Sequence, residues 1–141
     1  GVKRLIPSDS NMIHGVVKQE HRSVVLSGSF RKHLDYILKT KRTLVDLGVE
    51  VLSPRFEEPN NPGGEFVVFR GEEGASPLEL ERHHLNMIGK CDALVVCAPN
   101  GYVGASALIE IGYAQALGKR VIFTETPEEF MLQTLPAEVG L

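Results

Sequence analysis

The stretch Asp92–Phe123, DALVVCAPNGYVGASALIEIGYAQALGKRVIF, decides the fold of this chain. Its pattern predicts an apolar strand over 93–98, a glycine-containing loop, a helix over 105–117 and a second apolar strand over 120–124. A strand joined to the next strand through a helix forms a right-handed crossover between parallel strands. The stretch therefore predicts an α/β domain built on a parallel sheet.

A single carboxylate, Glu110, lies inside the helix of this stretch. The other polar side chains between 105 and 117 are Ser106, Tyr113 and Gln115. A helix that is apolar on every side is expected to be buried, and a buried carboxylate needs a partner or a task. Glu110 is expected either to pair with an arginine, such as Arg31 or Arg55, or to act on a bound ligand. As a ligand-facing acid it would attack an electrophilic carbon, stabilise a cationic transition state or accept a proton.

The same alternation of strand and helix occurs earlier in the chain. An apolar run over 23–28 predicts a strand, the next helix ends before Gly48, and a second strand follows over 49–53. An irregular segment over 55–75 is long enough to be a lid or a binding loop. The helix after it begins with the pattern of a capping box, Ser76 followed by Glu79. These elements predict one α/β domain over 23–141, and residues 1–22 are expected to form an arm or a short preceding element.

Composition limits the classes of function. The 141 residues are 43% hydrophobic and 23% charged, and the net charge of -3 gives no reason to expect a nucleic-acid polymer or an anionic membrane as partner. No apolar run approaches the roughly 20 residues needed to span a bilayer. Because no signal peptide is visible, the sequence predicts a cytoplasmic protein, and Cys91 and Cys97 are expected to be buried free thiols. Histidines and acids show no metal-ligand spacing, so neither a metal nor a cofactor is expected.

Ligands of parallel sheets bind beyond the carboxyl ends of the strands, which ranks the candidate residues. Gly28, Ser29, Phe30 and Arg31 follow the first strand and open a helix. Free backbone N–H groups, a hydroxyl and a guanidinium suit a phosphate or a carboxylate there. The other interpretation is an ordinary helix start with a surface arginine.

A second candidate binding segment, NGYVGAS, follows the third strand. Its glycines allow a ligand to approach the backbone, and the helix after it can bind an anion. The candidate residues are Asn100, Gly101, Tyr102, Gly104 and Ser106. Asp92 lies at the opposite edge, where its strand begins, and is expected to be structural.

Two adjacent histidines differ in their helical faces. His83 shares a face with Glu79 and Lys90, so we expect it to be solvated. His84 shares a face with apolar residues and is expected to point toward the sheet. It is either a packed core residue or a second catalytic residue beside Glu110.

Two blocks, VVLSGSFR over 24–31 and DALVVCAPNGYVGASALIEIGYAQALGKRVI over 92–122, resemble the nucleoside 2-deoxyribosyltransferase-like superfamily, which includes deoxynucleotide N-hydrolases. The resemblance implies a flavodoxin-like (Rossmann-like) three-layer sandwich with about five parallel strands, and a homo-oligomer, a dimer or higher. It implies that Glu110 is the nucleophile on C1′ of the sugar, and that Ser29 and Arg31 bind the 5′ end of the substrate. In the hydrolases a serine at the position of Ser106 helps to bind a 5′-phosphate.

The chain departs from the superfamily pattern at two acids. The acid expected eight residues before Asp92 is His84, and the acid expected six residues before Glu110 is Gly104. The chain resembles a branch of the superfamily that carries a glycine–tyrosine loop and this histidine. With the two carboxylates that handle the leaving base absent, His84 or a group on the 55–75 loop is expected to protonate it.

The expected function is cleavage or exchange of the N-glycosidic bond of a nucleoside or nucleotide, a small-molecule substrate. One alternative is a non-catalytic nucleotide-sensing module, which the missing acids favour. Another is a cytokinin-type phosphoribohydrolase of the lysine-decarboxylase-like group, whose PGGxGTxxE motif places the acid eight residues after a proline. Here Glu110 follows Pro99 by eleven residues, so this fit is poor.

Overall fold

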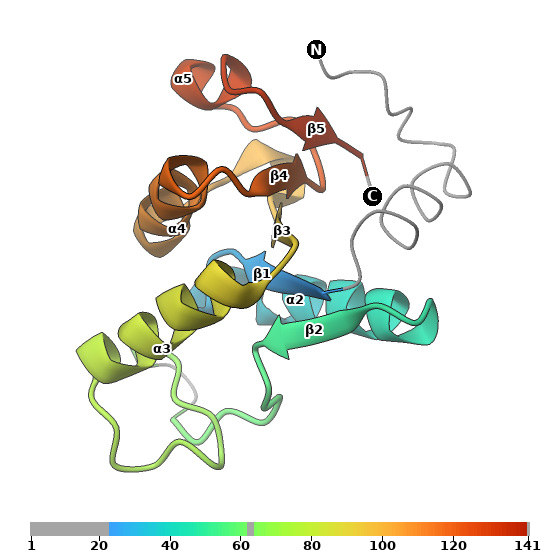
Figure 1. Ribbon diagram of the computed structural model, residues 1–141. Helices are drawn as coiled ribbons and strands as arrows, with labels where there is room; N and C mark the ends of the chain where they lie inside the picture. Colours follow the sequence, from blue (N-terminus) through green and yellow to red (C-terminus); the bar gives the residue numbers. More distant parts are fainter. Residues whose placement is uncertain (1–22, 62–63, 141) are drawn as a thin grey trace.

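Five parallel strands form the sheet of this chain in a computed structural model that describes residues 23–61 and 64–140 (Figure 1). Their order across the sheet is β2-β1-β3-β4-β5, and every neighbouring pair is parallel. The strands are β1 (Ser23–Ser27), β2 (Glu50–Ser53), β3 (Ala93–Val96), β4 (Arg120–Phe123) and β5 (Glu138–Val139). The direction in which successive strands are added to the sheet reverses between β1 and β3. At such a switch point, parallel α/β sheets have a crevice that binds ligands.

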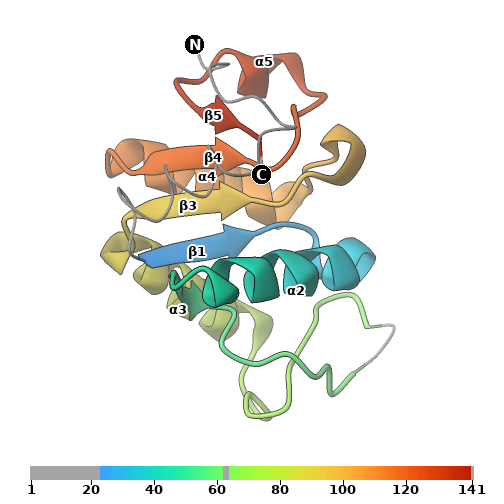
Figure 2. The same ribbon diagram turned by 90° about the vertical axis from the view of Figure 1, so that its right-hand side faces the viewer.

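Helices cover both faces of the sheet. They are α2 (Phe30–Asp46), α3 (Pro77–Lys90), α4 (Ala105–Ala116) and α5 (Phe130–Gln133), with a 3₁₀ turn, η2, over Pro99–Gly101. Figure 2 shows α2 in front of the sheet, with α3 and α4 behind it. This is the predicted flavodoxin-like, Rossmann-like three-layer arrangement.

Alternation along β1 decides which side chains reach the site. Val24 and Leu26 pack in the apolar cluster under α2, whereas Val25 packs in the cluster under α3 and α4. Because successive side chains of a strand point to opposite faces, Ser27 belongs to the face of Val25. The last residue of β1 therefore carries its hydroxyl toward α3 and α4, where it meets Glu110.

The helix boundaries follow the predicted signals. Ser76 Oγ accepts a hydrogen bond from the Glu79 N–H at 3.1 Å, and Glu79 Oε1 accepts one from the Ser76 N–H at 2.8 Å, which confirms the capping box. Gly48 follows α2 with a φ of 87°, a conformation that glycine adopts without strain. The last helix, α5, begins at Phe130.

The prediction that the helix containing Glu110 is buried on every side is wrong for the single chain. Ala107, Glu110, Ile111 and Ala114 of α4 are buried against the sheet. The opposite face is apolar but exposed, with Ile109 58% and Leu117 46% accessible and with Leu108 and Tyr113 beside them. Periodicity reports that a face is apolar; it does not report what covers that face.

Two further expectations concern the whole chain. Cys91 and Cys97 are buried and free, as predicted. No helix among residues 23–61 and 64–140 is both long enough and apolar enough to cross a membrane. The arm expected over residues 1–22 lies outside the described residues.

Candidate functional site

A cavity of about 350 Å³ opens at the carboxyl ends of β1 and β2, on the side covered by α3 and α4. Most of the predicted site residues line it together, although they come from the turn after β1, from α3, from the loop before α4 and from α4 itself. These residues are Gly28, Ser29, Phe30, Arg31, His84, Tyr102, Gly104, Ser106 and Glu110. The volume lies within the range of small-molecule sites, roughly 300–1,000 Å³.

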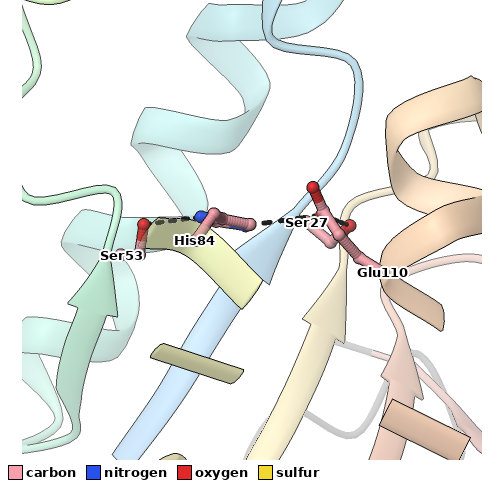
Figure 3. Close-up of polar contacts among 4 residues, drawn as sticks. All are labelled: Ser27, Ser53, His84 and Glu110. Carbon is pink, nitrogen blue, oxygen red and sulfur yellow. Dashed lines mark hydrogen bonds and ion pairs between the residues drawn. The ribbon is translucent and has the colours of Figure 1, made fainter. Parts of the chain in front are cut away.

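Glu110 belongs to a chain of polar contacts that runs from Ser53 through His84 and Glu110 to Ser27 (Figure 3). Its side chain is only 5% exposed. Ser27 Oγ donates a hydrogen bond to Glu110 Oε1 over 2.5 Å, and His84 Nε2 lies 3.3 Å from the same oxygen. The partner of this buried acid is therefore a histidine, and the expectation of an arginine partner is wrong.

His84 is held from its other side by Ser53. Nδ1 of the ring lies 2.6 Å from Ser53 Oγ, at the carboxyl end of β2. The Phe30 ring packs edge-on against the imidazole, with 6.2 Å between centroids. Ser53 of β2, Glu110 of α4 and the Phe30 ring thus fix the orientation of His84, which points toward the sheet as predicted.

The surroundings of Glu110 keep it ionised. Burial by itself would raise the pKa of this carboxyl. Interactions with His84, Glu81 and Ser27 outweigh burial and lower the pKa of Glu110 below its usual value. The carboxylate is accordingly negative at neutral pH, within an otherwise apolar wall.

A second acid, Glu81, lines the same cavity and was not predicted. It lies on α3 one turn before His84, and its carboxyl group is close enough to Glu110 to interact with it directly. Burial is the main cause that raises the pKa of Glu81, and the hydrogen bond and charge of Glu110 add to it, which brings the value to about 8. The spacing of three residues to His84 was the available signal, since it puts both side chains on one side of a helix.

Two helix N-termini meet at the other end of the cavity. Ser29 precedes α2 and Gly104 precedes α4, and neither helix start has a side-chain cap: the Ser29 hydroxyl makes no capping hydrogen bond, and glycine has no side chain. A Cβ atom placed on Gly104 would lie 3.7 Å from Ser29 Cβ, so the two helix ends are neighbours. Arg31 lies in the first turn of α2 and lines the cavity with an exposed side chain. Free N–H groups and a guanidinium in one place suit an anion.

Tyr102 lines this end of the cavity. Its ring packs against His33, with 5.6 Å between centroids, and Lys32 Nζ lies 4.4 Å from the ring centroid. The hydroxyl of Tyr102 would meet a Cβ placed on Gly104 at 3.4 Å. Gly104 therefore leaves space between Tyr102 and Ser29 that a larger side chain would occupy.

Asn100 and Gly101 do not line the cavity, although the sequence suggested them as binding residues. The Asn100 N–H donates a hydrogen bond to Glu125 Oε1 at 3.1 Å. Gly101 is buried with a φ of 85°, and a Cβ on it would approach Thr126 O to 2.9 Å. Both residues anchor the loop after β3 to the segment after β4, which holds Tyr102 and Gly104 in place.

Two other sequence expectations concern residues near the motifs. Asp92 lies at the opposite edge of the sheet, where its Oδ2 accepts a hydrogen bond from the Ser23 N–H at 3.0 Å. Its position is the structural one that was predicted. His83 is exposed, as expected, and lies at the mouth of the cavity.

No group of three or more His, Cys, Asp or Glu side chains within the described ranges could hold a metal ion. Comparison with known protein families finds no family model that matches this chain, and a search of curated proteins finds no match. The chemistry of the cavity, and in particular the buried and ionised Glu110, is what the structure offers toward a function.

Proposed function

We propose that this protein cleaves the N-glycosidic bond of a nucleoside or nucleotide, with Glu110 as the nucleophile. The observation that carries the proposal is a carboxylate that is buried, ionised and held by Ser27 and His84 in the wall of a cavity sized for a small molecule. A carboxylate in such surroundings suits attack on a carbon that gains positive charge as its leaving group departs.

The proposed reaction has two steps. Glu110 attacks C1′ of the sugar through an oxocarbenium-like transition state, the C1′–N bond breaks, and the base leaves after it gains a proton. The product of this step is a glycosyl ester of Glu110. Water or a second base then attacks C1′ and releases Glu110, which gives hydrolysis or base exchange.

The two ends of the cavity suggest how a substrate is oriented. The helix ends at Ser29 and Gly104, with Arg31, suit a 5′-phosphate. Phe30, Phe66 and Phe69 line the cavity beside α3 and provide an apolar surface for the base, with 5.9 Å between the Phe30 and Phe69 ring centroids. With Glu110 between these two ends, the C1′ atom would lie against the nucleophile.

The first test is incubation of the protein with a panel of nucleosides, nucleoside 5′-monophosphates, their deoxy forms and NAD. We expect release of free base from at least one member, detected by chromatography, and faster release from phosphorylated members. Thermal stabilisation by a nucleotide without any base release would favour the nucleotide-sensing alternative and contradict the enzymatic one.

We also propose that the exposed apolar face of α4 binds a second copy of the chain. Ile109, Leu117 and their neighbours form a stripe along this face, and between Ala105 and Leu117 the only charged residue is the buried Glu110. A face without charge can pack against its own copy about a two-fold axis without repulsion between like charges. The resemblance to a superfamily of homo-oligomers adds to this proposal.

Self-association predicts that Ile109→Asp shifts the protein toward monomer, because a charge would be buried in an apolar interface. Sedimentation velocity at several concentrations measures the shift. Val45→Asp is the matched control, since Val45 is 50% exposed on α2 and Ile109 is 58% exposed on α4. A wild-type protein that sediments as a monomer at all concentrations, or an equal effect of both substitutions, would contradict this interface.

A further inference from the structure

Glu81 has no role in the reaction as described so far, yet it lies in the same cavity as Glu110. Its Oε2 atom is enclosed by the described part of the chain and has no hydrogen-bond partner there. A buried carboxyl oxygen without a partner costs free energy, so such groups are uncommon unless a ligand or a reaction uses them. Its position one turn before His84 directs the side chain toward the nucleophile.

The two acids of the cavity differ in protonation. Ser27 and His84 hold Glu110 as a carboxylate. Burial and the neighbouring Glu110 raise the pKa of Glu81 to about 8, so Glu81 keeps its proton at neutral pH. Two carboxyl groups whose surroundings separate their pKa values in this way are suited to the roles of acid and nucleophile. The other charged or titratable groups that line the cavity are Arg31, Glu65, Glu72, His83, His84 and Tyr102.

His84 is less suited to protonate the base. Its Nδ1 atom is engaged with Ser53 at 2.6 Å, and its Nε2 atom faces Glu110 at 3.3 Å. Both nitrogens therefore point along the chain of contacts that holds the nucleophile. His84 is a positioning residue for Glu110, and the proton for the base must come from another group.

We infer that Glu81 is the acid that protonates the leaving base and the base that afterwards activates water, an assignment that rests on the proposed function. In the first step the Glu81 O–H proton moves to a nitrogen or oxygen atom of the base, and the electron pair of the C1′–N bond goes to the base. Glu110 forms the C1′–O bond, and Glu81 becomes a carboxylate. In the second step Glu81 takes a proton from water, the oxygen of water bonds to C1′, and the ester bond to Glu110 breaks.

The closeness of the two acids agrees with this two-step route. Single-displacement glycosidases keep their carboxyl groups about 6.5–9.5 Å apart to admit a water molecule, whereas double-displacement enzymes keep them closer. Glu81 and Glu110 line one cavity and lie close enough for each carboxyl group to shift the pKa of the other. The nucleophilic role of Glu110 and the acid role of Glu81 therefore support each other.

Glu81→Gln tests the assignment, because glutamine keeps the size of the side chain but cannot give up an acidic proton. We expect the rate of base release to fall by about 100-fold or more, within the usual range of general acid catalysis. A 4-nitrophenyl 2-deoxyriboside, carrying the 5′-phosphate if the natural substrate requires it, has a leaving group that needs no proton. Formation of nitrophenolate in a pre-steady-state burst should therefore be nearly unchanged in this variant, and later turnovers should be slow.

The pH profile gives a second readout. Wild-type kcat/KM should fall above about pH 8 as Glu81 loses its proton, and Glu81→Gln should remove this limb. Glu50→Gln is the control, since Glu50 is an exposed acid at the opposite end of the sheet, at the start of β2. Equal losses with the natural substrate and the nitrophenyl substrate, or an unchanged pH limb, would overturn the assignment.

A separate measurement distinguishes failure of this inference from failure of the proposed function. Carbon-13 NMR of glutamate-labelled protein should show a carboxyl that titrates near pH 8, disappears in Glu81→Gln, and titrates at lower pH in Glu110→Gln. If this signal is present but the wild-type protein releases no base, the proposed function fails while the acid pair stands. Base release by the wild-type protein without such a signal overturns the role of Glu81 alone.

Discussion

Glu110→Gln should lower the rate of base release by at least about 1,000-fold while the protein remains folded. A decrease of this size is expected when an enzyme loses its nucleophile. The amide has the size of the carboxylate, and its oxygen can still accept the hydrogen bond from Ser27. It has no negative charge with which to attack C1′ or to stabilise a cationic transition state. Chromatographic measurement of free base under single-turnover conditions gives the rate.

The fold of this variant is checked by circular dichroism and thermal unfolding. The lowered pKa of Glu110 means that its charge stabilises the folded state, so we expect the unfolding temperature to fall while the protein remains folded at the assay temperature. Glu50→Gln makes the same change at an exposed site and should leave the rate as it is. A Glu110→Gln protein that keeps a tenth or more of the wild-type rate would show that another group attacks the sugar.

The layers of the fold were predictable because the sequence marks its strands and helix ends locally. β1 and β3 are short apolar runs that end near glycine or proline, and α3 carries a capping box that can be recognised from Ser76 and Glu79. Strand β5 carries no such mark. It has two residues, and its place depends on pairing with β4 and on the ion pair of Arg120 with Glu138, neither of which a local pattern contains.

Glu110 was predictable for a different reason: a carboxylate is conspicuous in an apolar helix. Its partners were not, since Ser27 and Ser53 resemble ordinary serines at strand ends. Their role depends on sheet register and on contacts over long separations, 83 residues between Ser27 and Glu110 and 31 between Ser53 and His84. Glu81 was missed because an acid on a helix with many charged residues has the pattern of a solvated side chain.

Periodicity failed in a similar way for the outer face of α4. Leu108 and Ile109 have the pattern of core residues, but no element of the described chain covers them. A helix buried partly by its own sheet and partly by another molecule has the same sequence pattern as one buried in a single core. The exposure of α4 in the single chain therefore distinguishes a helix buried in one core from a helix that a second molecule covers, whereas the sequence pattern is the same for both.

Arg31→Ala should raise KM for a nucleoside 5′-monophosphate by about 10- to 100-fold and leave kcat nearly the same. The guanidinium lies at the end of the cavity where the helix starts at Ser29 and Gly104 meet. It belongs to α2, whereas the two acids belong to α3 and α4. A charge-assisted hydrogen bond to phosphate contributes about 1.5–3 kcal/mol, which corresponds to a change in KM of roughly 10- to 150-fold. This hydrogen bond contributes equally to binding of the substrate and of the transition state, so its loss should raise KM and leave kcat unchanged.

Arg42→Ala is the matched control, because Arg42 is also exposed on α2 but lies three turns further along the helix and does not line the cavity. The corresponding nucleoside without phosphate supplies the second comparison, and its KM should be the same for the wild-type protein and for Arg31→Ala. If both substrates weaken equally, Arg31 shapes the cavity instead of binding phosphate. If binding of neither substrate weakens, the backbone N–H groups at the two helix N-termini hold the anion. These groups lie beyond the carboxyl ends of the parallel strands and need no side chain to bind an anion.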